Sequence, residues 1–178
     1  LFPFCSPHLE SKKWPFYNEL ITLIKKHYRE EYKIVIAPGP KEIKESALFN
    51  AEAILDNRKS LNISQLSSLI KLSKFVVAND TGPAHMSAHL NTKGISLFGS
   101  HTTAYKVSIE REHFKAIQVA DLKKLSAERV FERIKNILNS QNLVDRLKQY
   151  EEGIRDTNHE VFEKLFGKDF WASGGRAL

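Results

Sequence analysis

The sequence predicts an α/β protein built on a doubly wound parallel sheet with helices on both faces. Short runs of apolar and β-branched residues alternate along the chain with segments whose apolar residues recur at helical spacing. Residues 74–102 also form one complete strand, tight turn, helix and strand, the pattern of a βαβ unit. No internal repeat or low-complexity tract interrupts this alternation.

The elements follow from these patterns in chain order. Strands are expected at 1–4, 34–37, 75–78, 95–98 and 116–119, because these runs are short and apolar. Helices are expected at 15–28, 41–49, 63–72, 84–90 and 126–138. Pro15, Asn62 and Ser126 suit helix starts.

Three stretches are less regular. One further strand is expected between 49 and 63, without a definite position. Residues 103–115 look irregular, with Tyr105 and Phe114 as buried anchors. A helical period runs from 141 to 170, so we predict a donor-binding domain at 1–139 and a helical tail at 140–178.

Composition describes an ordinary globular protein. The chain has 178 residues, 42% of them hydrophobic, and a formal net charge of +6 spread over helical faces. No zinc spacing or aromatic-interleaved basic motif points to nucleic acid. The single cysteine, Cys5, suits a cytoplasmic location, and the basic balance leaves peripheral contact with the anionic inner membrane open. The chain does not begin with Met, so we expect a piece of a longer protein.

The residues with the clearest chemistry follow the strand at 75–78. Asp80, Thr81 and Gly82 lie where that strand gives way to a helix, and Pro83 fits the first helical turn. Free amides and the helix dipole favour a phosphate there, and His85 lies one turn further on. Ordinary helix capping would explain the same residues, but the carboxyl ends of strands are where open α/β sheets bind ligands.

The segment DTGPAHMSAHL, followed by ISLFGSHT, resembles the signature of the bacterial heptosyltransferases. Members carry Asp-(Ser/Thr)-Gly-x-x-His, a small-residue helix, and a strand that ends in Phe-Gly-x-Thr. The residues matched to this signature are Asp80, Thr81, Gly82, His85, Phe98, Gly99 and Thr102. The resemblance implies the Rossmann-like, donor-binding half of a two-domain GT-B glycosyltransferase, with the amino-terminal acceptor domain missing from this chain.

The resemblance also implies roles for residues outside that segment. In the family, a lysine before Trp-Pro and a nearby hydroxyl hold the diphosphate of a nucleotide-sugar. Lys12 and Ser6 are the corresponding residues here, with Lys13 the less favoured choice. Glu42 corresponds to an acidic residue that approaches the ribose, although a glutamate in a first helical turn also complements the helix dipole.

The implied activity is transfer of a heptose or related sugar from a nucleoside diphosphate, expected to be ADP, to a lipopolysaccharide core acceptor. Lys12, Asp80 and His85 are the expected catalytic residues, without a metal or a cofactor, and the general base is expected in the missing domain. Two alternatives remain open: a non-catalytic nucleotide-binding module, and another GT-B enzyme such as a sugar-nucleotide epimerase. We expect the isolated chain to bind nucleotide weakly and not to turn over.

Overall fold

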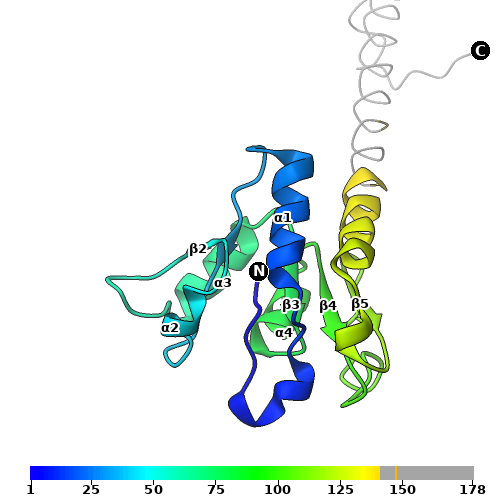
Figure 1. The fold of residues 1–178 in the computed structure, drawn as a ribbon, viewed down its shortest axis with the longest axis horizontal. Coiled ribbons are helices and arrows are strands. Elements are labelled where there is room, and N and C mark those ends of the chain that lie inside the picture. The colour runs from blue at the N-terminus through cyan, green and yellow to red at the C-terminus, as the bar shows by residue number, and fades with distance from the viewer. Residues whose placement is uncertain (141–146, 148–178) are drawn as a thin grey trace, which may run out of the picture. The chain divides into compact units, whose positions relative to one another are not determined.

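The computed structural model describes residues 1–140 and 147. Its strands form two parallel groups: β1 (Val35–Ile36) pairs with β2 (Glu52–Ala53), and β3 (Val76–Asn79), β4 (Gly94–Phe98) and β5 (Phe114–Gln118) pair in that order. Figure 1 shows β4 and β5 side by side. Every ladder is parallel, as the sequence predicts for a βαβ architecture.

The amino-terminal segment joins the two groups of strands. The amino nitrogen of Leu1 donates to the Val35 carbonyl at 2.7 Å, and Phe2 N–H donates to the Val77 carbonyl at 2.9 Å. The order across the molecule is therefore β2, β1, residues 1–2, β3, β4, β5. Numbered along the chain this is 3-2-1-4-5-6, the Rossmann order, which changes direction between residues 1–2 and β3.

Helices cover both faces of this arrangement. Val76 and Ala78 of β3 belong to one apolar cluster with residues of α3 (Ile63–Leu72) and α4 (Gly82–His89). Because side chains alternate along a strand, Asn79 faces the other way, where its Oδ1 accepts from the Tyr17 hydroxyl of α1 (Tyr17–Tyr28) at 3.3 Å. Helices thus pack against both faces of the strands, as expected for a doubly wound sheet.

Local chemistry explains where several elements begin. The Asn62 side chain accepts from Gln65 N–H at 2.9 Å and Gln65 Oε1 accepts from Asn62 N–H at 2.9 Å, a capping box that starts α3. The first residue of β4, Gly94, has to lack a side chain, because a Cβ there would lie 2.5 Å from the Val76 carbonyl oxygen. Ser126 Oγ accepts from Arg129 N–H at 3.3 Å at the start of the helix that begins at residue 127.

The structure corrects several expected elements. The first strand is reduced to one bridge at Phe2, and the helix expected at 41–49 is only α2 (Ile43–Ser46). The strand between 49 and 63 is β2, and β5 begins at Phe114 instead of 116. Phe114 is buried as expected, but Tyr105 is 94% exposed, so its predicted role as an anchor is wrong.

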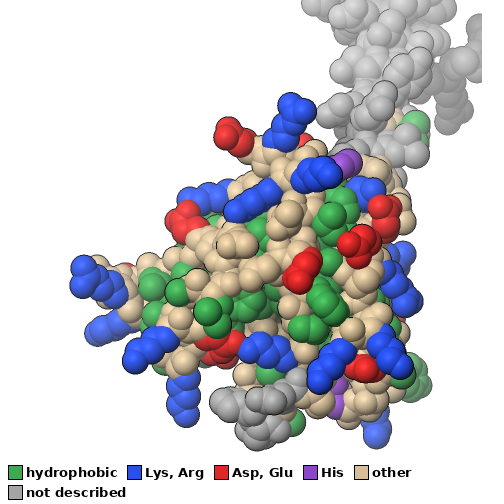
Figure 2. Space-filling view, in the orientation of Figure 1, with side chains coloured by type: hydrophobic (Ala, Val, Ile, Leu, Met, Phe, Trp, Pro, Cys, Tyr) green, Lys and Arg blue, Asp and Glu red, His purple; other side chains and the backbone are tan. Residues whose placement is uncertain are grey.

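The chain divides into two compact units, 1–134 and 135–178, and the first holds every named helix and strand. The predicted boundary at 139 and the helical tail concern residues that lie almost entirely outside the described part, so both stay predictions. No helix among the described residues is both long enough and apolar enough to cross a bilayer. Lys and Arg side chains are scattered over the face shown in Figure 2, in keeping with the spread of charge along the sequence.

Candidate active site

The candidate site is centred on Asp80, the first residue after β3. Its Oδ2 accepts a hydrogen bond from Lys12 Nζ at 2.7 Å and lies 3.0 Å from His101 Nε2. Its Oδ1 lies 3.4 Å from His85 Nε2. The side chain of Asp80 is only 4% exposed, so these three groups supply the environment of a buried carboxylate. The predicted catalytic residues Lys12, Asp80 and His85 are therefore brought together.

The partners of Asp80 decide its ionisation. Burial alone would raise the pKa of the Asp80 carboxyl group, because a low-dielectric environment disfavours the charged form. Hydrogen bonds and positive charge from Lys12 and His101 outweigh that effect and hold the pKa below its ordinary value of 3.8. Asp80 is therefore a carboxylate at neutral pH and can act as an acceptor only.

Lys12 reaches Asp80 from the short 3₁₀ segment Pro7–Lys12, 68 positions away in the sequence. Trp14 anchors the end of this segment: its indole Nε1 donates to the Leu125 carbonyl at 2.7 Å, and its backbone N–H donates to Asn79 Oδ1 at 3.3 Å. Lys13 points elsewhere and pairs with Glu45. The geometry thus separates the two adjacent lysines and brings Lys12 into the site.

The start of α4 forms the second wall of the site. Thr81 is the N-cap residue, but its hydroxyl bonds back to the Asn79 carbonyl at 3.2 Å and does not cap the helix. Within the described residues, no group accepts from the backbone N–H of Gly82, and a Cβ placed on Gly82 would meet nothing within 4 Å. This helix end therefore offers a free amide and open space beside Lys12 and Asp80.

A pocket of about 230 Å³ adjoins this helix start, at the point where the strand order changes direction. Ser6, Glu42 and Thr81 line it, together with apolar groups that include Leu61, Leu66 and Pro83. Glu42 Oε2 accepts from Gly39 N–H at 2.8 Å, which fastens the turn after β1, and among the described residues no donor bonds to the second oxygen, Oε1. Ser6 is exposed at the rim and makes no described contact with Lys12 or Asp80.

His101 is a site residue that the sequence analysis missed. The family pattern Phe-Gly-x-Thr was matched to Phe98, Gly99 and Thr102, but its fourth position is two residues after Gly99 and falls on His101. The imidazole of His101, and not the Thr102 side chain, reaches Asp80. Its position in the sequence could have indicated this role, because His101 follows the carboxyl end of β4, next to the strand end that carries Asp80.

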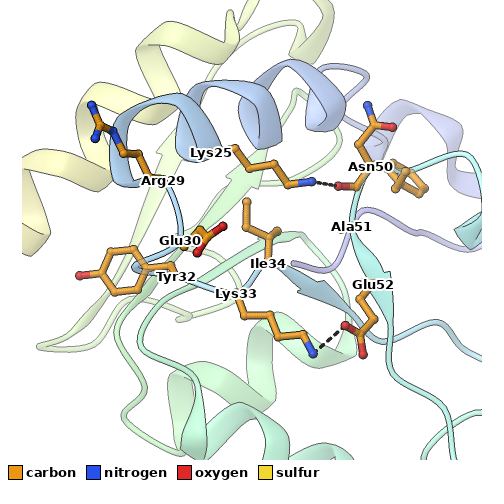
Figure 3. Close-up of a pocket in the computed structure, with 10 residues that line it drawn as sticks. Lys25, Arg29, Glu30, Tyr32, Lys33, Ile34, Asn50, Ala51 and Glu52 are labelled. Carbon is orange, nitrogen blue, oxygen red and sulfur yellow. Dashed lines mark hydrogen bonds and ion pairs between the residues drawn. The ribbon is translucent and has the colours of Figure 1, made fainter.

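A larger pocket, of about 760 Å³, lies at the opposite edge of the sheet, between the end of α1 and the start of β2 (Figure 3). Its two lysines already have partners: Lys25 Nζ donates to the Asn50 carbonyl at 2.6 Å, and Lys33 Nζ lies 2.7 Å from Glu52 Oε2. None of the predicted site residues lines it. Among the described residues, no group of three His, Cys, Asp or Glu side chains is arranged to hold a metal ion.

Comparison with solved structures gives the same fold. E. coli heptosyltransferase WaaC with ADP-2-deoxy-2-fluoro heptose is similar with a TM-score of 0.63 and 20% identity, over 76% of this chain and 41% of that one. E. coli ADP-heptose LPS heptosyltransferase II gives a TM-score of 0.64 and 21% identity, over 78% and 45%. The chain thus spans less than half the length of these relatives. Comparison with curated proteins gives no match.

Residues 1–134 match the pattern of glycosyltransferase family 9 (heptosyltransferase), which is about three quarters of the chain. This range ends where the first compact unit ends, and it includes Lys12, Asp80, His85 and the pocket beside α4. On this evidence the chain belongs to glycosyltransferase family 9, the heptosyltransferase family.

Proposed function

We propose that this chain is the donor-binding half of a GT-B glycosyltransferase that transfers a heptose or related sugar from a nucleoside diphosphate to a lipopolysaccharide core acceptor. The observation that carries the proposal is the convergence of Lys12, Asp80 and the open helix start at Gly82 on the point where the strand order changes direction. This is where nucleotides bind in open α/β sheets.

The diphosphate is proposed to lie between Lys12 and the start of α4. The Lys12 ammonium has three hydrogens; it donates to Asp80 Oδ2 at 2.7 Å and lies 3.5 Å from the Asp80 carbonyl oxygen, which leaves at least one hydrogen for a phosphate oxygen. The Gly82 N–H and the positive end of the α4 dipole add a second source of stabilisation. His85 is partly exposed, and its Nε2 lies 3.4 Å from Oδ1 of the same Asp80.

The nucleoside is proposed to occupy the pocket of about 230 Å³ beside α4. Pockets for whole drug-sized ligands have volumes of about 300–1,000 Å³. This smaller pocket therefore suits the base and ribose alone, and the transferred sugar would lie outside it. Its apolar lining suits a base, and the second oxygen of Glu42 is in place to accept from ribose hydroxyls. Adenine is the favoured base because the WaaC structures hold ADP or an ADP-linked sugar analogue.

In the proposed reaction the bond between the anomeric carbon of the donor sugar and the diphosphate oxygen breaks, and a bond forms between that carbon and the acceptor hydroxyl oxygen. Negative charge builds up on the leaving diphosphate, so the Lys12 ammonium and the Gly82 N–H strengthen their hold as the reaction proceeds. The hydroxyl proton passes to a general base that we place in an amino-terminal acceptor domain. Cytoplasmic action beside the inner membrane completes the proposal, because the lipopolysaccharide core is attached to lipid.

Isothermal calorimetry of the 178-residue chain with ADP, UDP and GDP tests this proposal. We expect ADP to bind most tightly, because the relatives hold ADP. Lys12→Ala should weaken ADP binding at least about tenfold by removing a charge-assisted bond to phosphate. Lys13→Ala is the matched control and should bind as the parent does, because Lys13 pairs with Glu45 outside the site. Failure of all three nucleotides to bind, or equal affinities for parent and Lys12→Ala, would refute the proposal.

A further inference from the structure

We propose that His101 is a positioning residue of the donor-phosphate site, which holds the Asp80 carboxylate in place so that Lys12 can turn its remaining hydrogens to a diphosphate. This inference deepens the proposed function and rests on it.

The contact between His101 and Asp80 is short and sheltered. Nε2 of His101 lies 3.0 Å from Asp80 Oδ2, the same oxygen that accepts from Lys12. The two side chains are only 11% and 4% exposed, so water competes little for this bond. Because the Asp80 carboxylate can only accept, the ring hydrogen in this contact is on Nε2.

The second ring nitrogen of His101, Nδ1, makes no hydrogen bond with a described residue that would explain the orientation of the imidazole. Nδ1 of His101 is buried, and no hydrogen-bond partner reaches it among the described residues. Buried polar atoms normally have partners, and an exception calls for an explanation. The ring stacks on Phe98, with centroids 6.1 Å apart and planes inclined by 15°, so Asp80 is the polar group toward which the imidazole is aimed.

The backbone that carries His101 is fastened on both sides of the residue. Nε2 of Gln118, at the end of β5, donates to the carbonyl oxygens of Gly99 at 2.6 Å and Thr102 at 3.1 Å. Oε1 of the same amide accepts from Ala104 N–H at 3.1 Å. One side chain of the neighbouring strand thus holds the loop at three points, and His101 presents Nε2 from a fixed position.

The consequence for ligand binding follows from the shared oxygen. With His101 in place, Asp80 keeps one firm partner when the ammonium of Lys12 turns toward a phosphate. Without it, the Asp80 side chain has, among the residues that the structure describes, only Lys12 on Oδ2 and the more distant His85 at 3.4 Å on Oδ1. The Asp80 carboxylate would then hold the Lys12 ammonium more strongly, so fewer of its hydrogens could turn to a phosphate. An incoming diphosphate would also be repelled by a carboxylate whose negative charge has one hydrogen-bond donor fewer.

The test compares His101→Ala with His101→Gln, whose amide N–H can take the place of Nε2–H. We expect His101→Ala to bind ADP about tenfold more weakly, and His101→Gln to recover most of that affinity. His89→Ala, an exposed histidine of α4, is the control and should match the parent. Carboxyl-carbon NMR of Asp80 in ligand-free variants that keep the parent's circular dichroism spectrum adds a second readout: the pKa of Asp80 should rise in His101→Ala and return toward the parent in His101→Gln.

The outcomes separate this inference from the function on which it rests. If the parent binds ADP and Lys12→Ala does not, while His101→Ala binds as the parent does, the inference is overturned and the proposed function stands. If no nucleotide binds the parent, the proposed function fails and takes the inference with it. Should His101→Ala not fold, His101→Met, which fills the space but cannot donate to Asp80, takes its place: parent-like affinity of a folded Met variant overturns the role, and a roughly tenfold loss that the Gln variant recovers supports it.

Discussion

Two adjacent lysines give a matched test of how burial sets the strength of an ion pair in this protein. Lys12 pairs with Asp80 at 2.7 Å, and the two side chains are 20% and 4% exposed. Lys13 pairs with Glu45, and those side chains are 41% and 34% exposed. We therefore compare Lys12→Met with Lys13→Met, because methionine keeps the length of the apolar stem and removes the ammonium.

The expected magnitudes follow from these contacts. Removing one partner of a fully buried pair costs about 3–5 kcal/mol. His101 stays on the same Asp80 oxygen, and Lys12 is partly exposed, so we expect Lys12→Met to lower the free energy of unfolding by about 2 kcal/mol. The Lys13 pair is exposed on both sides, and its loss should cost less than about 0.5 kcal/mol.

Thermal unfolding followed by circular dichroism measures both variants. For a chain of this size, about 2 kcal/mol corresponds to a fall in Tm of roughly 4–8 °C. Adding Asp80→Asn to Lys12→Met should restore most of the lost stability, because the unpaired carboxylate is then gone. Equal shifts for the two lysine variants, or no shift for Lys12→Met, would refute the reasoning that the buried Asp80 carboxylate depends on Lys12.

The remaining predictions concern two glycines and the titration of Asp80. Gly94→Ala should cost about 2–3 kcal/mol in urea unfolding, because a Cβ there would lie 2.5 Å from the Val76 carbonyl oxygen. Gly82→Ala places its Cβ in open space, so its free energy of unfolding should stay within about 0.5 kcal/mol of the parent's. The same Cβ would enter the space proposed for the diphosphate, so ADP binding should weaken. A loss of stability as large as that of Gly94→Ala would contradict this prediction. The pKa of Asp80 is lower in the folded chain than its unfolded value of about 3.9. Ionised Asp80 therefore stabilises the fold at pH values above about 3.9, and this contribution is lost as the pH falls through the folded-state pKa. Urea midpoints from pH 7 to pH 2 should therefore show the gap between parent and Asp80→Asn narrowing in acid, and a widening gap would count against the assignment.

Elements with strong local patterns were predictable from the sequence. The unit from β3 to β4 combines apolar runs with helix-start residues, and α3 begins and ends at the predicted residues because a capping box marks its start. β2 has only two residues, one of them the exposed Glu52, so it carries no apolar period. Tyr105 was expected to be buried because it is aromatic, but its neighbours Ala104 and Ile109 are the buried residues of that loop.

The candidate site was predictable where family resemblance supplied the long-range contact. Spacing alone does not place Lys12 beside Asp80 across 68 positions, because the contact depends on how the first and fourth strands of the sheet neighbour each other. His101 was missed because the family pattern was matched one residue too late. The partner of Glu42 was also beyond prediction, since its bond to Gly39 N–H depends on the geometry of a turn.

The two halves of the site depend on a single buried polar residue that touches no ligand atom in the proposal. Asn79, the last residue of β3, donates from Nδ2 to the Pro3 carbonyl at 2.9 Å, and its Oδ1 accepts from Trp14 N–H and from the Tyr17 hydroxyl, each at 3.3 Å. It thereby ties the segment before Ser6 and the segment after Lys12 to the strand that carries Asp80. Because buried polar groups cost free energy unless each is satisfied, these bonds favour one arrangement over looser ones. The neighbouring Asp80 can therefore find Lys12 in place before any nucleotide arrives, which is the preorganisation that binding a diphosphate requires.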